Sequence, residues 1–206
     1  MASRKKRTRP RLRVVARAEL PTRYGRFTVL GVEDAGTGEN ALVLQRGPVG
    51  DGHVPLVRIH SQCLTGDVLA SQRCDCRAQL ELALEQIGKS RHGLLLYLPQ
   101  EGRGIGLMNK LRAYQLQDRG FDTVEANQKL GFAADSRDYR FSAAVLRKLG
   151  VRRIRLLSNN PDKVAQLEQA GVRVVERMPC QPPLSRHSRH YLRTKRDKLG
   201  HILAGI

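Results

Sequence analysis

The sequence predicts an α/β protein with a mixed sheet flanked by helices and an N-terminal half that is rich in β-strands. Two observations lead to this prediction. Residues 12–60 contain short apolar segments separated by glycine-rich turns, which is typical of strands. After Gln79, helical periodicity alternates with short apolar runs, which indicates a largely parallel sheet with crossover helices. Because no linker or internal repeat interrupts the chain, we expect one domain.

The individual elements follow from local patterns. Residues 26–30 and 41–44 are the clearest early strands. Apolar side chains recur with helical spacing from Leu80 to Ile87, which predicts a helix with one buried face. The apolar run at 94–98 is typical of a strand that is buried on both faces. Later elements are expected as helices at 107–118, 141–149 and 163–170 and as strands at 153–157 and 172–175.

The chain is strongly basic, and its charge is concentrated at the ends. Its 206 residues include 37 lysines and arginines against 19 acidic residues, a formal net charge of +18. Residues 1–13 hold seven basic side chains and no acidic one. Residues 181–206 hold six basic side chains and one acidic side chain, and residues 14–180 have a net charge of +6. That remainder suits an enzyme with an anionic ligand, so charge alone does not indicate nucleic-acid binding. We expect a disordered basic tail over 1–13, a folded domain over 14–180 and a basic C-terminal segment over 181–206.

Composition argues against membrane and secreted proteins. No apolar run approaches the roughly 20 residues that span a bilayer. The start of the chain also lacks the apolar centre of a signal peptide. We therefore expect a cytoplasmic protein with no membrane partner. In that reducing compartment, four cysteines indicate a metal site or a catalytic role more strongly than they indicate disulfides.

The most specific local pattern is Cys63-x10-Cys74-x-Cys76. Thiolates suit zinc, and a catalytic zinc keeps three protein ligands whereas a structural zinc has four. Three clustered cysteines therefore favour an open, catalytic site. Cys180 or His60 could instead complete a structural site, and the spacing alone also allows that no metal binds.

Loops after two of the expected strands form a second signal. In open α/β sheets, ligands bind beyond the carboxyl ends of the strands. The loop at 99–106 offers backbone donors and Arg103, while the loop at 158–163 offers a helix N-terminus and Lys163. A plain turn and a well-capped helix are the respective alternatives.

Three further polar residues are ambiguous by themselves. Asp135 and Arg137 lie in one turn, either as an ion pair in a solvated loop or as an acid/base group beside a phosphate clamp. Tyr114 lies on an expected helix, where a core position is the alternative to a catalytic one.

Together, these segments resemble GTP cyclohydrolase II, the zinc enzyme that opens riboflavin biosynthesis. The resemblance covers about residues 14 to 203, and the motifs occur in the order VRIHSQCLTGDVLASQRCDC, LPQEGRGIGLMNKLRAYQLQD, DTVEANQKLGFAADSRDY, LLSNNPDKV and HYLRTKRDKLGH. It implies a catalytic domain over 14–180. It also implies the stand-alone form, because this chain has no room for the dihydroxybutanone phosphate synthase domain often fused to the family.

The resemblance assigns metal ligands and substrate contacts. Cys63, Cys74 and Cys76 would hold one catalytic Zn²⁺ per subunit. The implied GTP contacts are Arg58, Ile59, His60, Ser61, Gln62, Gln79, Glu101, Gly102, Arg103, Thr123, Ser158 and Lys163. The family usually has Glu where Gln62 stands. Gln62 is either a tolerated contact or a change that slows the reaction or stops it early.

The resemblance also implies catalytic roles. Tyr114 and Asp135 would act in acid/base chemistry or hydrogen bonding, and Arg137 would act at the α-phosphate. Family accounts make this arginine a covalent nucleophile. Because a guanidinium stays protonated with a pKa above about 12, a phosphate clamp is the simpler role, and both interpretations stay open.

The implied reaction converts GTP to formate, pyrophosphate and 2,5-diamino-6-ribosylamino-4(3H)-pyrimidinone 5′-phosphate. It begins riboflavin biosynthesis or a related specialised pathway. Mg²⁺ would accompany the triphosphate, and the family is expected to be homodimeric. One alternative is a paralogue that stops at the formamide intermediate or is inactive. Another is a nonenzymatic zinc protein that binds nucleic acid, for which 4% aromatic residues offer few stacking platforms; we expect no specific nucleic-acid partner.

Overall fold

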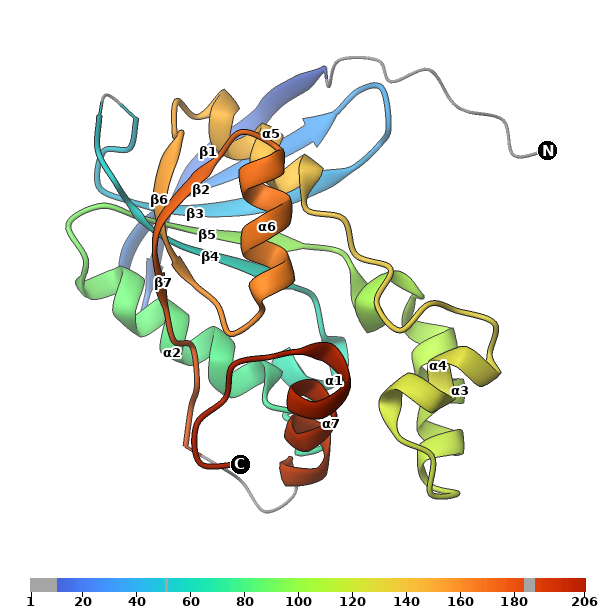
Figure 1. Cartoon of the computed structure of the whole chain (residues 1–206). Helices are drawn as coiled ribbons and strands as arrows, with labels where there is room; N and C mark the ends of the chain where they lie inside the picture. The colour runs from blue at the N-terminus through green and yellow to red at the C-terminus, as the bar shows by residue number, and fades with distance from the viewer. Residues whose placement is uncertain (1–10, 51, 184–187) are drawn as a thin grey trace.

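The strands form one mixed sheet in the computed structural model, which describes residues 11–50, 52–183 and 188–206 (Figure 1). The strand order is β1-β2-β3-β5-β4-β6-β7. The strands are β1 (Leu12–Thr22), β2 (Gly25–Asp34), β3 (Asn40–Arg46), β4 (Leu56–Ser61), β5 (Gly93–Leu98), β6 (Arg153–Leu157) and β7 (Arg173–Met178).

The sheet has an antiparallel half and a parallel half that meet at β5. Strands β1, β2, β3 and β5 pair antiparallel, whereas β5, β4, β6 and β7 pair in parallel. Parallel neighbours require crossover connections. The crossovers include α2 (Cys76–Lys89), α5 (Arg140–Lys148) and α6 (Pro161–Gln169). The predicted mixed sheet is confirmed, and its parallel part lies in the half of the chain where strand and helix alternate.

Helices cover both faces of the sheet. On one face, Val145 of α5 packs in the same core as Leu96. On the other face, Ile87 of α2 packs in a second core with Leu95. Successive side chains of the run at 94–98 therefore enter different cores. This explains why the run is continuously apolar instead of alternating.

The remaining helices lie around the carboxyl ends of the parallel strands and beyond them. They are α1 (Leu64–Asp67), the 3₁₀ turn η1 (Glu101–Gly104), α3 (Leu107–Gln117), α4 (Thr123–Lys129) and α7 (Arg189–Leu199). Helices α3 and α4 pack together away from the sheet (Figure 1), and α7 contacts α4. In the described part of the chain, no helix has the length and apolar character needed to cross a bilayer.

The N-terminal boundary differs from our expectation. Strand β1 begins at Leu12, so Leu12 and Arg13 belong to the sheet and not to the expected tail. Arg13 forms an ion pair with Glu33 on β2. Residues 1–10 of the expected tail lie outside the described residues. The sequence predicted strands from residue 12 but also a tail that ends at residue 13. The two overlap because most side chains of β1 are exposed, so charged residues are tolerated within the strand.

Replacing Leu96 tests the central core. Leu96 is fully buried, so Leu96→Ala should lower the free energy of unfolding by about 2–5 kcal/mol, because it removes buried atoms and leaves a cavity. Denaturant titration measures the loss. The matched control is Leu69→Ala in the loop after α1, which is 68% exposed and should cost less than about 1 kcal/mol. Equal losses in both variants would contradict this core.

Candidate active site

Three loops meet at the carboxyl ends of β4, β5 and β6. Strand β4 lies between the other two and runs parallel to both. Ser61 at the end of β4 donates a hydrogen bond to Gln100 in the loop after β5, at 3.0 Å. Gln100 in turn donates to the backbone oxygen of Asp138 at 3.2 Å. This edge is where the sequence predicted ligand binding.

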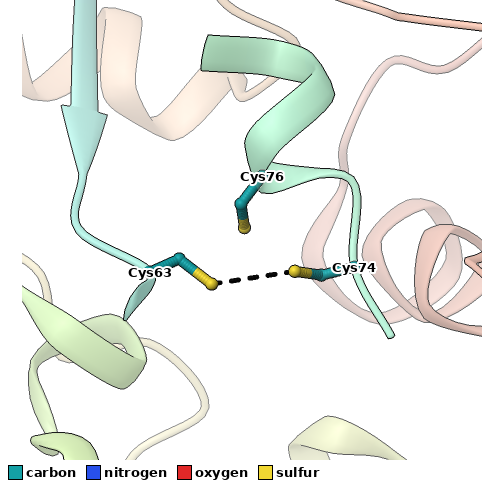
Figure 2. A group of neighbouring side chains, drawn as sticks. All are labelled: Cys63, Cys74 and Cys76. Atoms are coloured by element: carbon teal, nitrogen blue, oxygen red, sulfur yellow. Dashed lines mark hydrogen bonds between the residues drawn. The ribbon is translucent and has the colours of Figure 1, made fainter. Parts of the chain in front are cut away.

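Cys63, Cys74 and Cys76 form a cluster at this edge (Figure 2). Cys63 follows β4, Cys74 precedes α2, and Cys76 is the first residue of α2. The three sulfur atoms lie within 4.8 Å of one another, and those of Cys63 and Cys74 are 3.7 Å apart. Sulfurs bound to a tetrahedral zinc at about 2.3 Å would be about 3.8 Å apart. The cluster therefore has nearly the dimensions of a three-thiolate zinc site.

The three neighbouring thiols shift one another's pKa values. Hydrogen bonds from Cys74 and Cys76, assisted by the charge of Lys110, lower the pKa of Cys63 far below its ordinary value. The hydrogen bond with Cys63 raises the pKa of Cys74 to about 11, and Cys63 and Cys74 raise that of Cys76. A divalent cation would neutralise the thiolates, so that all three cysteines could be deprotonated together. The donor set therefore fits Zn²⁺.

Neither alternative fourth ligand joins the cluster. The buried sulfur of Cys180 lies 3.7 Å from the backbone oxygen of Gln79. His60 directs Nε2 toward the carboxylate of Asp67 at 3.1 Å. Among the described residues, the group that could hold a metal consists of the three clustered cysteines. A site with three protein ligands leaves a position for water, as catalytic zinc requires.

A buried lysine contacts the cluster. Lys110 on α3 donates to the Cys63 sulfur at 3.1 Å and to Glu101 Oε1 at 2.6 Å. Glu101 Oε2 accepts the backbone N–H of Leu64 at 2.7 Å, so both carboxylate oxygens of this assigned GTP contact hold the loops in place. Three thiolates would give a bound Zn²⁺ an excess of negative charge. The ammonium of Lys110 offsets that excess.

Asp67 organises the other side of Cys63. Its carboxylate accepts hydrogen bonds from the backbone of Cys63 at 3.0 Å and from the hydroxyl of Tyr97 at 2.9 Å. Burial lowers the pKa of His60, although the hydrogen bond to Asp67 opposes this shift. A neutral His60 would donate from Nε2 to Asp67, which leaves Nδ1 as an acceptor without a partner among the described residues.

Tyr114 lines the cavity that contains the cysteines. Its hydroxyl lies 3.0 Å from that of Thr65, and Arg73 stacks over its ring at 4.8 Å. Burial raises the pKa of Tyr114, so the phenol keeps its proton at neutral pH. Gln62 and Thr123 line the same cavity.

A second cavity adjoins the first and is lined by cations. Arg58 donates to Gln79 Oε1 at 2.7 Å, and Lys163 donates to the backbone oxygen of Ile59 at 2.8 Å. Burial, followed by repulsion from Arg58 and Arg137, lowers the pKa of Lys163 well below its ordinary value. The cations are held close together, and an anionic ligand would relieve their repulsion.

Arg137 lines both cavities, while Asp135 lies behind it. Arg137 Nε donates to Asp135 Oδ1 at 2.9 Å, and its Nη2 donates to the other oxygen. Burial opposes ionisation of Asp135, but the hydrogen bonds from Arg137 outweigh it and lower the pKa of this carboxyl. The carboxylate is therefore ionised and paired. Asp135 is therefore better suited to positioning Arg137 than to acting as a free general base.

Arg103 has a strained backbone. Its φ of 61° is uncommon for a residue with a side chain. Its Nη2 atom is buried without a hydrogen-bond partner among the described residues, and its guanidinium lies 5.7 Å from the ring of Tyr191. Strain of this kind concentrates at binding sites, where the surrounding structure maintains it.

Comparisons with known proteins agree with this geometry. The model of the GTP cyclohydrolase II family matches residues 13–179. The chain belongs to the GTP cyclohydrolase II family. GTP cyclohydrolase-2 of Pseudomonas putida (strain W619) is 54% identical over 189 residues, which cover 92% of each chain. The protein of the same name from Azotobacter vinelandii (strain DJ / ATCC BAA-1303) is 54% identical over 93% of this chain and 92% of its own.

One solved structure shows a weaker likeness. It is a two-domain 3,4-dihydroxy-2-butanone 4-phosphate synthase from A. baumannii, 20% identical, with a TM-score of 0.39. The match covers 71% of this chain and 34% of that chain.

In this GTP cyclohydrolase II family member, the two cavities collect nearly all the residues assigned by resemblance. The first is lined by Ser61, Gln62, Cys63, Cys74, Cys76, Glu101, Gly102, Arg103, Tyr114, Thr123 and Arg137. The second is lined by Arg58, Ile59, His60, Ser61, Cys76, Gln79, Arg137, Ser158 and Lys163. Asp135 is outside both linings and reaches the site through Arg137.

Sequence reasoning missed several residues that hold the site together. Lys110 lies one helical turn before Tyr114, and this spacing could have placed it on the same face of α3. Asp67 lies four residues after Cys63 in α1, a similar signal. Tyr191 and Lys195 of α7 also line the cavities. Both belong to the motif HYLRTKRDKLGH, but the motif did not show which distant residues they contact.

Replacing Lys110 tests its effect on the metal site. Lys110→Met should weaken Zn²⁺ binding on the order of 10- to 100-fold, because the charge beside the Cys63 sulfur is lost. Competition with a chelator of known affinity measures the change. Lys89→Met on α2, an exposed lysine paired with Glu85, is the control. Unchanged zinc affinity in Lys110→Met would show that this ammonium does not stabilise the site.

Proposed function

We propose that this protein hydrolyses GTP to formate, pyrophosphate and 2,5-diamino-6-ribosylamino-4(3H)-pyrimidinone 5′-phosphate. The proposal rests chiefly on one observation: the cavity of the three-thiol metal site shares a wall with a cavity of buried cations. A purine base and a triphosphate can therefore bind side by side. Membership of the family supports this reaction, the first step of riboflavin biosynthesis or of a related specialised pathway.

The cavity with the cysteines would receive the guanine base. Cys63, Cys74 and Cys76 would hold Zn²⁺, which when bound activates water for attack on the imidazole carbon of guanine and then on the formamide. Tyr114 keeps its proton and has Thr65 as a hydrogen-bond partner. Its hydroxyl can therefore donate to a ring nitrogen as the imidazole ring opens.

The cationic cavity would receive the triphosphate. Arg58 and Lys163 line it, and Arg137 lies at its junction with the first cavity. Mg²⁺ would accompany the phosphates, because a divalent cation would neutralise charge that builds up on them during cleavage. The position of Arg137 suits the α-phosphate, next to the nucleoside.

We infer that Arg137 is a phosphate clamp and not a covalent nucleophile. The guanidinium would have to lose a proton to attack phosphorus. Asp135 holds it in its charged form by accepting hydrogen bonds from both Nε and Nη2. A charged, oriented guanidinium stabilises the negative charge that develops on the α-phosphate while water attacks. Pyrophosphate then leaves.

We further propose that the protein is a cytoplasmic homodimer. Support for the dimer comes from apolar side chains on the sheet. Val15 and Leu42 are 52% and 53% exposed. Leu42 pairs with Gly31 on β2, and the side chain of Val15 lies next to the same glycine. A second copy of the chain would remove this apolar surface from water.

The products formed from GTP test the proposed function. Protein loaded with Zn²⁺ and Mg²⁺ should release formate and pyrophosphate in equal amounts, because one nucleotide yields one of each. Cys74→Ser should abolish formate release, because it removes a metal ligand. Cys180→Ser, outside the cluster, is the control and should retain it.

The other outcomes identify the alternatives. Pyrophosphate without formate would indicate a paralogue that stops early, and Gln62→Glu should then restore formate release if Gln62 is the cause. Release of neither product would contradict the enzymatic proposal and favour a nonenzymatic zinc protein. Full formate release by Cys74→Ser would contradict the role of the metal.

Lys163 makes a prediction about pH. Its pKa is lowered in the free protein, so above that pKa the side chain is neutral. A bound triphosphate favours the charged form and raises the pKa, so GTP binding should take up a proton and weaken as the pH rises. Calorimetry over a pH series, in buffers of different ionisation enthalpy at each pH, measures the uptake. Lys163→Met should remove it, and identical binding heats for the unsubstituted protein in all buffers would contradict the prediction.

A further inference from the structure

Helix α7 contributes to the walls of both cavities, although it lies beyond residues 13–179, which match the family model. Tyr191 lines both cavities, while Lys195 and the nearby His201 line the second. Helix α7 packs against α4, and its Lys195 contacts Asp75, directly before α2. None of the substrate contacts assigned by resemblance lies on α7.

The buried ammonium of Lys195 contacts the loop that contains the metal ligands. Its Nζ donates to Asp75 Oδ1 at 2.7 Å, and the two side chains are only 8% and 5% exposed. Asp75 stands between Cys74 and Cys76 in the sequence. A buried ion pair is often no more stabilising than apolar side chains of similar volume. Stability alone therefore does not explain this ion pair.

Asp75 connects Lys195 to the cationic cavity. Its Oδ2 accepts a hydrogen bond from Gln79 Nε2 at 2.6 Å, and Gln79 Oε1 accepts one from Arg58 Nη2 at 2.7 Å. An ionised carboxylate can only accept, so it determines that the carbonyl end of the Gln79 amide faces Arg58. The hydrogen bonds thus run without a break from Lys195 to Arg58, an assigned substrate contact.

The docking of α7 does not depend on Lys195 alone. The backbone N–H of Ile202 donates to the backbone oxygen of Asn159 at 2.8 Å, in the loop after β6. Lys198 forms ion pairs with Asp122 and Glu125 at the start of α4. Leu192 is buried beneath the helix. Loss of the Lys195 charge should therefore disturb the orientation of Arg58 without releasing α7.

We propose that Lys195 is a positioning residue for nucleotide binding. Its ammonium holds the Asp75 carboxylate in place, Asp75 orients Gln79, and Gln79 directs the guanidinium of Arg58 into the cationic cavity. This inference rests on the proposed function, because it takes a nucleoside triphosphate as the ligand of that cavity.

Three single variants test the inference in the full-length, zinc-loaded protein. Lys195→Met should raise the Kd for a GTP analogue with a methylene bridge between the α- and β-phosphates, and the KM for GTP, on the order of tenfold. Its kcat should change less, and its zinc content should stay the same. Lys195→Arg keeps the charge and should recover most of the affinity. Arg193→Met, an exposed position on the same helix, should bind like the unsubstituted protein.

A double variant separates positioning from stability. Lys195→Met leaves the Asp75 carboxylate buried without its cation, so its Tm should fall. Asp75→Asn combined with Lys195→Met removes that charge and should recover Tm. Affinity should stay low, because an Asn amide can donate as well as accept and no longer determines the orientation of Gln79. Recovery of affinity together with Tm would show that Lys195 acts only on stability.

Two outcomes would overturn the inference directly. One is an unchanged analogue Kd in Lys195→Met, and the other is an equal loss of affinity in Arg193→Met. Failure of the proposed function looks different, because the unsubstituted protein would then neither bind the analogue nor release formate from GTP. Analogue binding by the unsubstituted protein is therefore measured first.

Discussion

The parallel pairing of β4 with both β5 and β6 is the constraint on which the site depends. Parallel neighbours end at the same edge of a sheet, so the segments after these three strands must meet. Those segments carry Cys63, the loop with Arg103, and the helix N-terminus with Lys163. Burial of the strands on both faces makes this edge rigid, because a shift in register would break both cores at once.

The rigid edge holds charges close together, and nearby groups balance most of them. Lys110 compensates Cys63 and Glu101, Asp135 compensates Arg137, and Asp75 compensates Lys195. The charge that is left unbalanced is positive. Burial and the charges of Lys195 and Arg137 lower the pKa of His201 to about 3. A polyanionic nucleotide is the kind of ligand that such a field favours, and a divalent cation is what the three thiols favour.

Elements with buried faces were easier to predict from the sequence than exposed or short elements. The apolar run at 94–98 and the helical periodicity from Leu80 could be predicted because one or two buried faces dictate their residue types. Strand β1 begins inside the expected tail, since an exposed strand at the edge of the sheet can accept charged residues. Helix α4 was not predicted, although Asp122 and Glu125 form a capping box at its start. That helix is short, and its apolar pattern is weak.

The chemistry of the site could be predicted from the amino-acid sequence, because thiols at fixed spacing and glycine-rich or proline-initiated loops carry their properties wherever they are placed. The resemblance then assigned residues that the structure gathers into two adjoining cavities, with Asp135 behind them. The three-dimensional packing was needed to show that Cys180 lies outside the metal cluster, that Lys110 contacts Cys63, and that α7 completes the walls of the cavities. The physical reason is that a buried charge needs a partner in space, and no local pattern shows that Lys195 meets Asp75 across 120 positions of the chain.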